Sequence, residues 1–254
     1  MRPWRSMISA ACAALLSCNA LYAQPPAPYE AEYNVYRNGK RIGRASITLE
    51  TTGDGVFRYS RHSKGEKGLA AFLNTSETET AEFEADNGSY RPKNYYSRLK
   101  VAGRKRGWEA QFDWQESRIT GNTRDAQFDL ATEPGLLDPV SLQFALIDAL
   151  AEDHRPLEFR VLDGAKIEER KFTAAPAAGI KTALGCTDSI KVDRVRVNST
   201  RYTTSWHAVA AAYIPVRLDH GKHGDKTNSL RLERLSIDGK AITFSDTCAG
   251  DEEA

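Results

Sequence analysis

The chain has 254 residues, of which 35 are Lys or Arg and 34 are Asp or Glu, so its net charge is +1 when the histidines are neutral. This balance gives no global positive field, and we therefore expect no nucleic-acid partner.

Residues 1–23 are predicted to be a secretory signal peptide. Arg2 and Arg5 make its start positive, and residues 7–16 form an uncharged, mostly apolar run, which is typical of an export signal. The run is about half the roughly 20 apolar residues that a membrane-spanning helix needs, so we expect no transmembrane segment. Cleavage removes both arginines and leaves a mature chain with a net charge of −1.

Two cleavage sites are compatible with this leader. Cleavage after Ala23 leaves Gln24 as the N-terminus and gives a free periplasmic protein, which is the favoured location. Alternatively, residues 15–18 (Leu-Leu-Ser-Cys) resemble a lipobox, in which Cys18 is acylated and anchors the protein to the outer membrane. The sequence leaves both locations open.

Cys186 and Cys248 are the cysteines that remain for folding, because Cys12 is removed with the leader and Cys18 is either removed or acylated. An even pair in an exported chain, outside any C-x-x-C motif, indicates a disulfide rather than a metal site or a nucleophile. We predict that this bond fixes the C-terminal tail.

Alternation of apolar and polar residues runs through most of the chain. It spans residues 29–35, stops at Asn38-Gly39 and resumes at residues 42–49. Asn-Gly favours the two-residue turn of a β-hairpin, and Asn87-Gly88, Asp163-Gly164 and Asp238-Gly239 are similarly placed. These turns predict an antiparallel meander. Further strands are predicted at residues 56–63, 76–85, 93–101, 108–114, 157–162, 167–173, 190–197, 201–209, 216–220, 229–237 and 241–244.

Some segments depart from this regular pattern. The apolar phase changes between Val192 and Val195 and again between Leu232 and Leu235. Bulges near residues 193–194 and 233–234 would restore one buried face and bend the sheet. Residues 174–184 are rich in Ala, Pro and Gly and are predicted to be a loop.

One helix is predicted at about residues 138–151. Asp138 is a good N-cap and Pro139 suits the first turn, while Leu142, Leu146 and Leu150 recur at helical spacing. Its apolar stripe would pack on the sheet. The predicted fold is mainly β: an antiparallel meander that forms a strongly curved sheet or partly open β-barrel with one packed helix. We expect a single β-rich domain at residues 24–254, with two β halves joined by the helix.

Several short motifs resemble those of a known family. They are, in chain order, residues 33–36 (Tyr-Asn-Val-Tyr), 137–142 (Leu-Asp-Pro-Val-Ser-Leu), 206–208 (Trp-His-Ala) and 214–216 (Ile-Pro-Val). Together they are similar to an exported bacterial family catalogued as domain of unknown function 3108. The resemblance implies a β-rich envelope protein without an assigned activity, and it identifies no catalytic residue.

No strong catalytic motif is present: there is no G-x-S-x-G, H-E-x-x-H, P-loop or G-x-G-x-x-G. Glu77, Glu79, Glu82 and Glu84 are close in sequence, but alternation along a strand would divide them between two faces. We therefore assign no catalytic residue, metal ligand or cofactor and do not expect an enzyme, although a polysaccharide hydrolase remains one alternative.

Aromatic and basic residues indicate a binding site instead. Trp108, Phe112 and Trp114 share one face of a predicted strand, where they either fill the core or line a ligand cavity, together with Trp206 from a later strand.

Arg104, Lys105 and Arg106 lie at a predicted hairpin tip, which is either a solvated turn or a contact for an anionic group. We predict that the protein binds or carries an amphipathic, lipid-like ligand or a glycan. The other alternative is a scaffold that binds a partner protein of the cell envelope.

Overall fold

The computed structural model describes residues 26–53, 55–86 and 88–248. The predicted signal peptide, its cleavage sites and Cys18 lie outside these residues. In the part that is described, sixteen strands belong to one sheet. No helix among these residues is long and apolar enough to span a membrane.

The first half of the chain is an antiparallel meander in which each strand pairs with the next. A short helix, α1 (Gly68–Phe72), lies between the third and fourth strands. The strands are β1 (Tyr29–Arg37), β2 (Lys40–Gly53), β3 (Val56–Gly65), β4 (Ser76–Asp86), β5 (Ser89–Val101), β6 (Arg104–Asp113), β7 (Arg118–Thr123) and β8 (Gln127–Ala131).

The second half forms another meander, and the pairing of its strand β15 with β1 joins the two halves. The short strand β9 pairs in parallel with β10. The elements are β9 (Leu136–Leu137), α2 (Ser141–Ala151), β10 (Leu157–Asp163), β11 (Lys166–Thr182), β12 (Gly185–Val195), β13 (Arg201–Ala208), the 3-10 helix η1 (Val209–Ala211), β14 (Pro215–Lys222), β15 (Asn228–Ile237) and β16 (Lys240–Ala241).

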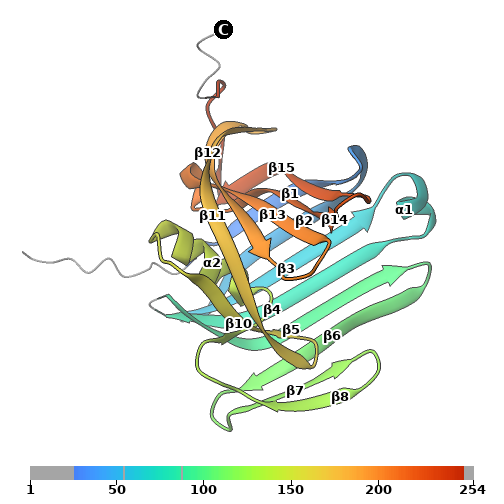
Figure 1. Cartoon of the computed structure of the whole chain (residues 1–254), viewed down its shortest axis with the longest axis vertical. Helices are drawn as coiled ribbons and strands as arrows, with labels where there is room; N and C mark the ends of the chain where they lie inside the picture. Colours follow the sequence, from blue (N-terminus) through green and yellow to red (C-terminus); the bar gives the residue numbers. More distant parts are fainter. Residues whose placement is uncertain (1–25, 54, 87, 249–254) are drawn as a thin grey trace, which may run out of the picture.

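The sheet curls on itself without closing its hydrogen-bond ladder (Figure 1). β8 and β9 stand at the two ends of the strand order. Side chains bridge the gap instead: Phe112 of β6 and Ile119 of β7 pack in one cluster with Leu136 of β9 and Leu162 of β10. The predicted curved, partly open barrel of mainly β structure is thus confirmed.

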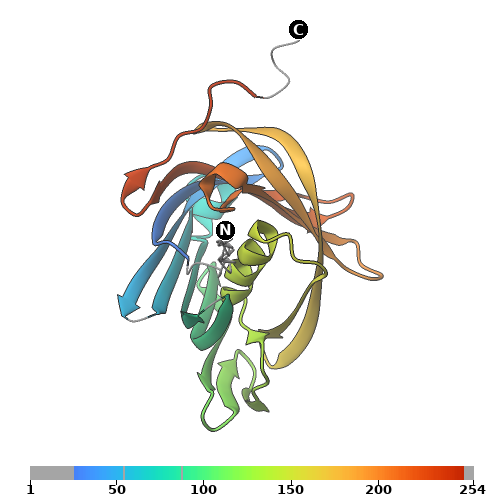
Figure 2. The ribbon, with the colours of Figure 1, turned by 90° about the vertical axis from the view of Figure 1, so that its left-hand side faces the viewer.

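Helix α2 lies inside the curled sheet (Figure 2). Its Phe144 is 2% exposed, and its ring centroid lies 5.0 Å from that of Phe83 and 6.3 Å from those of Tyr59 and Tyr90. The predicted helix is therefore confirmed at Ser141–Ala151, and its apolar side fills the interior that an open sheet would leave empty.

Strand register confirms one predicted bulge and contradicts the other. The pairing of β1 with β15 skips Glu233, so the bulge near residues 233–234 is present. The ladders that join β12 to β11 and β13 do not shift at residues 193–194, so the prediction there was wrong. As a result Arg194 stays on the interior face, and Val195 and Val197 are 43% and 84% exposed.

The predicted loop at residues 174–184 was also wrong. β11 runs through most of it as part of Lys166–Thr182, with a register shift between Ala177 and Ile180. A bulge of this kind lets a strand absorb residues that do not suit a regular ladder.

The predicted disulfide is confirmed between Cys186 and Cys248. It joins the start of β12 to the C-terminal segment, which also pairs through a bond from the Cys186 N–H to the Ser245 carbonyl at 2.7 Å. The bond is compatible with a location outside the reducing cytoplasm.

We predict that Phe144→Ala lowers the free energy of unfolding by about 3–5 kcal/mol, because it removes a buried ring and leaves a cavity. Urea denaturation followed by circular dichroism measures this change. Phe72→Ala is the matched control, since Phe72 is 85% exposed, and we expect it to change stability by less than about 0.5 kcal/mol. Equal effects of the two variants would contradict the role given to α2.

Replacing both bonded cysteines by serine should lower the free energy of unfolding by about 2–4 kcal/mol, because the unfolded chain gains conformational freedom. Thermal denaturation with and without a thiol reductant tests this. The wild type should lose stability in reductant and the double variant should not respond. An oxidised wild type no more stable than the variant would show that the bond does not support the fold.

Candidate functional site

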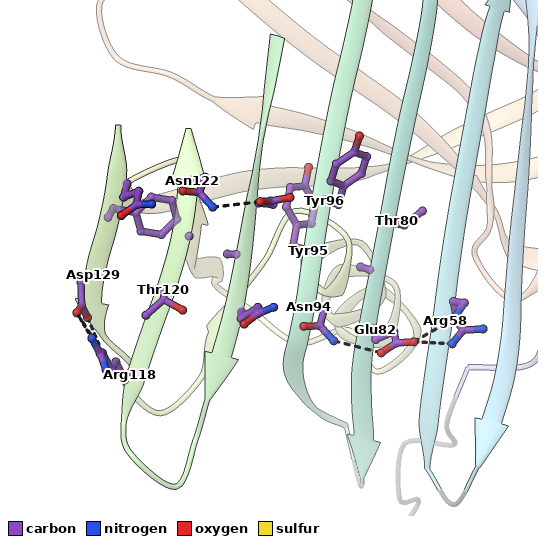
Figure 3. Close-up of a pocket in the computed structure, with 17 residues that line it drawn as sticks. Arg58, Thr80, Glu82, Asn94, Tyr95, Tyr96, Arg118, Thr120, Asn122 and Asp129 are labelled. Atoms are coloured by element: carbon purple, nitrogen blue, oxygen red, sulfur yellow. Dashed lines mark hydrogen bonds and ion pairs between the residues drawn. The ribbon is translucent and has the colours of Figure 1, made fainter. Parts of the chain in front are cut away.

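A groove of about 860 Å³ lies on the outer face of β3–β8 (Figure 3). Alternation along these strands sends Tyr95 and Ala110 to the interior, where they are 4% and 2% exposed, and their neighbours outward. The outward side chains that line the groove come from six strands. They are Arg58, Thr80, Glu82, Asn94, Tyr96, Glu109, Gln111, Arg118, Thr120, Asn122, Gln127 and Asp129.

Neighbouring strands approach closely at Gly121, one of the residues that line the groove. A Cβ atom there would lie 2.3 Å from the Glu109 carbonyl oxygen and 2.3 Å from the ring of Phe128. Only glycine allows this contact without a shift of the backbone. Because neighbouring strands twist, the outer face of a sheet need not be flat.

Ion pairs fix the carboxylates at both sides of the groove. Arg58 donates to Glu82 Oε1 from Nε at 3.0 Å and from Nη2 at 2.7 Å, and Asn94 donates to Oε2 at 3.2 Å. The hydrogen bond from Arg58 holds the pKa of Glu82 below its usual range. On the other side, Arg118 Nη2 lies 2.5 Å from Asp129 Oδ2 and likewise lowers the pKa of that carboxyl.

Other polar groups in the groove are available to a ligand. The side chains of Thr80, Gln111, Thr120 and Gln127 make no hydrogen bond or ion pair with another described residue. Tyr96 is half-buried, and the guanidinium of Arg98 lies 4.9 Å from its ring centroid. The groove therefore offers free donors and acceptors beside an aromatic ring.

A second pocket of about 210 Å³ continues the groove and shares Tyr96, Glu109 and Asn122 with it. Its lining is basic, with Arg98, Lys105, Arg106 and Arg124, and it also includes Trp108. The structure thus brings together three residues that the sequence singled out: Lys105, Arg106 and Trp108. Arg104 is exposed at the hairpin tip, paired with Val101, and does not line either pocket.

The other predicted aromatic residues lie elsewhere. Phe112 is 8% exposed in the core, and Trp114 stacks on it at 6.2 Å and donates a hydrogen bond to the Pro92 carbonyl at 2.7 Å. Trp206 is half-buried on β13, with the guanidinium of Arg217 4.6 Å from its ring. These three side chains line neither the groove nor the basic pocket beside it.

The four glutamates of β4 divide between the faces, as strand alternation predicts. Glu79 is 6% exposed inside the sheet, where it accepts a hydrogen bond from Tyr95 at 2.7 Å and lies 3.3 Å from Arg61. Glu82 lies in the outer groove. Among the described residues, no group of three or more His, Cys, Asp or Glu is arranged to hold a metal ion.

A family model described as protein of unknown function, DUF3108, matches residues 31–223. The chain belongs to the DUF3108 family. The resemblance found in the sequence is thereby confirmed, and the family description assigns no activity.

One solved structure shares the fold of the DUF3108 chain, and a second gives a weaker match. A β-barrel-like protein of domain of unknown function DUF1849 from Brucella abortus matches with a TM-score of 0.54 at 9% identity, over 83% of this chain and 98% of that one. A Bacteroides fragilis protein with a YmcC-like fold matches with a TM-score of 0.34 at 9% identity, over 85% and 99% of the two chains. Comparison with curated protein sequences finds no match.

The DUF3108 chain also holds an acidic residue in its core. Asp138 is fully buried, and its Oδ1 accepts hydrogen bonds from the N–H groups of Val140 and Ser141, both at 2.7 Å, ahead of α2. Burial raises its pKa to about 7 despite these bonds. Through these two hydrogen bonds Asp138 caps the start of the helix that fills the interior of the sheet.

This carboxyl should make stability depend on pH. The folded pKa of about 7 lies above the ordinary value of 3.8, so the protonated carboxyl stabilises the folded state. This stabilisation is fully present below pH 3.8 and is lost as the pH rises from 3.8 to about 7. We predict that Asp138→Asn removes this contribution, worth about 4 kcal/mol.

Urea denaturation of both proteins between pH 4 and 8 measures this difference. The comparison also cancels the opposite contribution of His207, whose pKa burial lowers to about 4. Parallel stability curves for the wild type and the variant would contradict the assignment.

Proposed function

We propose that this DUF3108 protein binds an acidic glycan in the outer groove of β3–β8 and does not cleave it. The observation that carries the proposal is a groove of about 860 Å³ lined by amide, hydroxyl and carboxylate side chains. We place this binding in the periplasm, a location with which the disulfide is compatible.

The polar lining favours a sugar over a lipid chain. A hydrocarbon ligand needs an apolar cavity, but Phe112 and Phe144 pack within the core. Sugar hydroxyls both donate and accept hydrogen bonds, which suits the free side chains of Gln111, Thr120 and Gln127. Tyr96 supplies a ring against which the apolar face of a sugar can lie.

The adjoining basic pocket favours an acidic glycan over a neutral one. Arg98, Lys105 and Arg106 line it, and arginine binds carboxylate or phosphate groups through paired hydrogen bonds. A chain of sugars in the groove would bring an acidic substituent to these side chains.

The ion pairs favour binding over hydrolysis. A glycosidase needs one carboxyl with a raised pKa as its general acid. Arg58 and Arg118 instead lower the pKa of Glu82 and Asp129. These two carboxylates are therefore suited to accept hydrogen bonds from a ligand.

Isothermal titration calorimetry with a hexamer of galacturonic acid tests the proposal, with maltohexaose as the neutral probe. We expect the uronate to bind more tightly. Gln111→Ala combined with Gln127→Ala should weaken its binding by about tenfold, as the loss of two hydrogen bonds of about 0.5–1.5 kcal/mol each implies.

Gln115→Ala is the matched control, because Gln115 is exposed on the same hairpin outside the groove. Arg106→Ala should weaken binding of the uronate and not that of maltohexaose. The proposal fails if neither sugar binds, or if the groove variant and its control bind the uronate equally.

A further inference from the structure

In an antiparallel meander every second connection between strands lies at the same end of the sheet. The connections β14–β15, β1–β2, β3–β4 and β5–β6 all lie at this end, beside one another in the strand order. We call these four connections and the strand ends that flank them the basic rim. Figure 1 shows α1 and the β5–β6 hairpin of the rim together on the right-hand side.

Lysine and arginine dominate the basic rim. Arg37 and Lys40 flank the β1–β2 turn, Lys64 and Lys67 flank the start of the β3–β4 connection, and Lys100 and Arg104 flank the β5–β6 turn. Acidic residues are fewer: Glu66 is paired with Arg41 at 3.1 Å and Arg44 at 2.8 Å, and Asp225 lies beside Lys226 in the β14–β15 connection.

The opposite end carries charges of both signs. Asp113 and Glu116 lie at the β6–β7 connection just before Arg118, and Asp153, which follows α2, is paired with Arg155 at 3.0 Å. The whole chain is close to neutral, so the positive charge of the rim reflects a separation of charge along the strands and not an overall excess.

The rim end also displays apolar side chains. Among the large apolar side chains of the described residues, the most exposed are Phe72 at 85%, Val197 at 84% and Leu69 at 67%. Phe72 and Leu69 belong to α1, in the rim, and Val197 lies in the β12–β13 connection at the same end. At the opposite end of the described sheet, Val209 is the only exposed large apolar residue, at 44%.

The backbone holds the apolar residues of α1 in place. The carbonyl of Leu73, which follows the helix, accepts a hydrogen bond from the N–H of Ala102 in the β5–β6 turn at 2.7 Å. At its other side, the N–H groups of Glu66 and Lys67 donate to the Ile42 carbonyl at 2.8 and 3.1 Å. α1 is therefore fixed between two basic turns, with Leu69 and Phe72 directed into solvent.

We propose that the basic rim docks on the surface of an anionic phospholipid bilayer, with Leu69 and Phe72 inserted between the headgroups. The lysine and arginine side chains of the rim can contact the lipid phosphates, while the exposed apolar side chains between them reach the hydrocarbon beneath. Each basic side chain near an anionic bilayer adds about 1 kcal/mol of attraction. The rest of the fold, including the outer groove, then faces the aqueous phase.

Co-sedimentation with vesicles tests this proposal, using the chain without residues 1–23. The vesicles are phosphatidylcholine alone or phosphatidylcholine mixed with phosphatidylglycerol, each at low and high salt. We expect binding to the mixed vesicles that weakens as salt rises, and little binding to phosphatidylcholine alone.

Leu69→Ser combined with Phe72→Ser should weaken binding by about tenfold or more, because two apolar side chains no longer leave water. Val209→Ser is the matched control at the opposite end. Lys100→Glu with Arg104→Glu should also weaken binding, and Lys240→Glu, at the opposite end, should not. Circular dichroism confirms that each variant is folded.

The proposal is overturned if the wild type does not prefer the mixed vesicles, or if the rim variants bind as well as their controls. It goes beyond glycan binding and fails independently of it. Leu69 and Phe72 do not line the groove, so their double variant should bind the uronate hexamer normally even when it no longer binds vesicles.

Discussion

The packing of α2 against the inside of an unclosed sheet is the interaction on which the rest of this structure depends. A closed barrel stabilises its edges by hydrogen bonds between its first and last strands. Here β8 and β9 are the ends of the strand order, and apolar side chains replace that ladder. Phe144 contacts rings from β3, β4 and β5, and the cluster around Phe112 and Leu162 joins the two meanders. The interior is thus occupied by the protein itself, which leaves the outer face and the ends of the strands as the surfaces open to ligands.

Much of this fold follows from local sequence, because hairpin turns and alternation are short-range properties. Asn38-Gly39 and Asp238-Gly239 have positive φ angles at both positions, which is the backbone conformation that such pairs favour. The buried residues Ala31, Tyr33 and Leu49 belong to the alternating runs from which strands were predicted. The helix was also predictable, since a capping residue and an apolar repeat occur together.

The remaining features depend on contacts between distant segments. The apolar pattern of β12 favoured a bulge that would bury Val195, but its ladders with β11 and β13 keep their register and place Arg194 inside. The pKa of Arg194 is lowered to about 10, first by burial and then by the charges of Arg170 and Arg196. Similarly, Gln111 is one of many outward polar residues on strands, and nothing in the sequence distinguishes a flat outer face from a hollow one. The groove is a property of the assembled sheet, because six strands contribute its lining.

The separation of charge along the strands affects how the molecule is oriented as it approaches a charged surface. A nearly neutral body whose positive charge is concentrated at one end behaves as an electric dipole. A charged surface attracts such a body only weakly but exerts a torque on it, within a distance set by ionic screening. Near a negative surface the long axes of the strands would therefore turn toward the perpendicular, and the molecule would arrive already oriented.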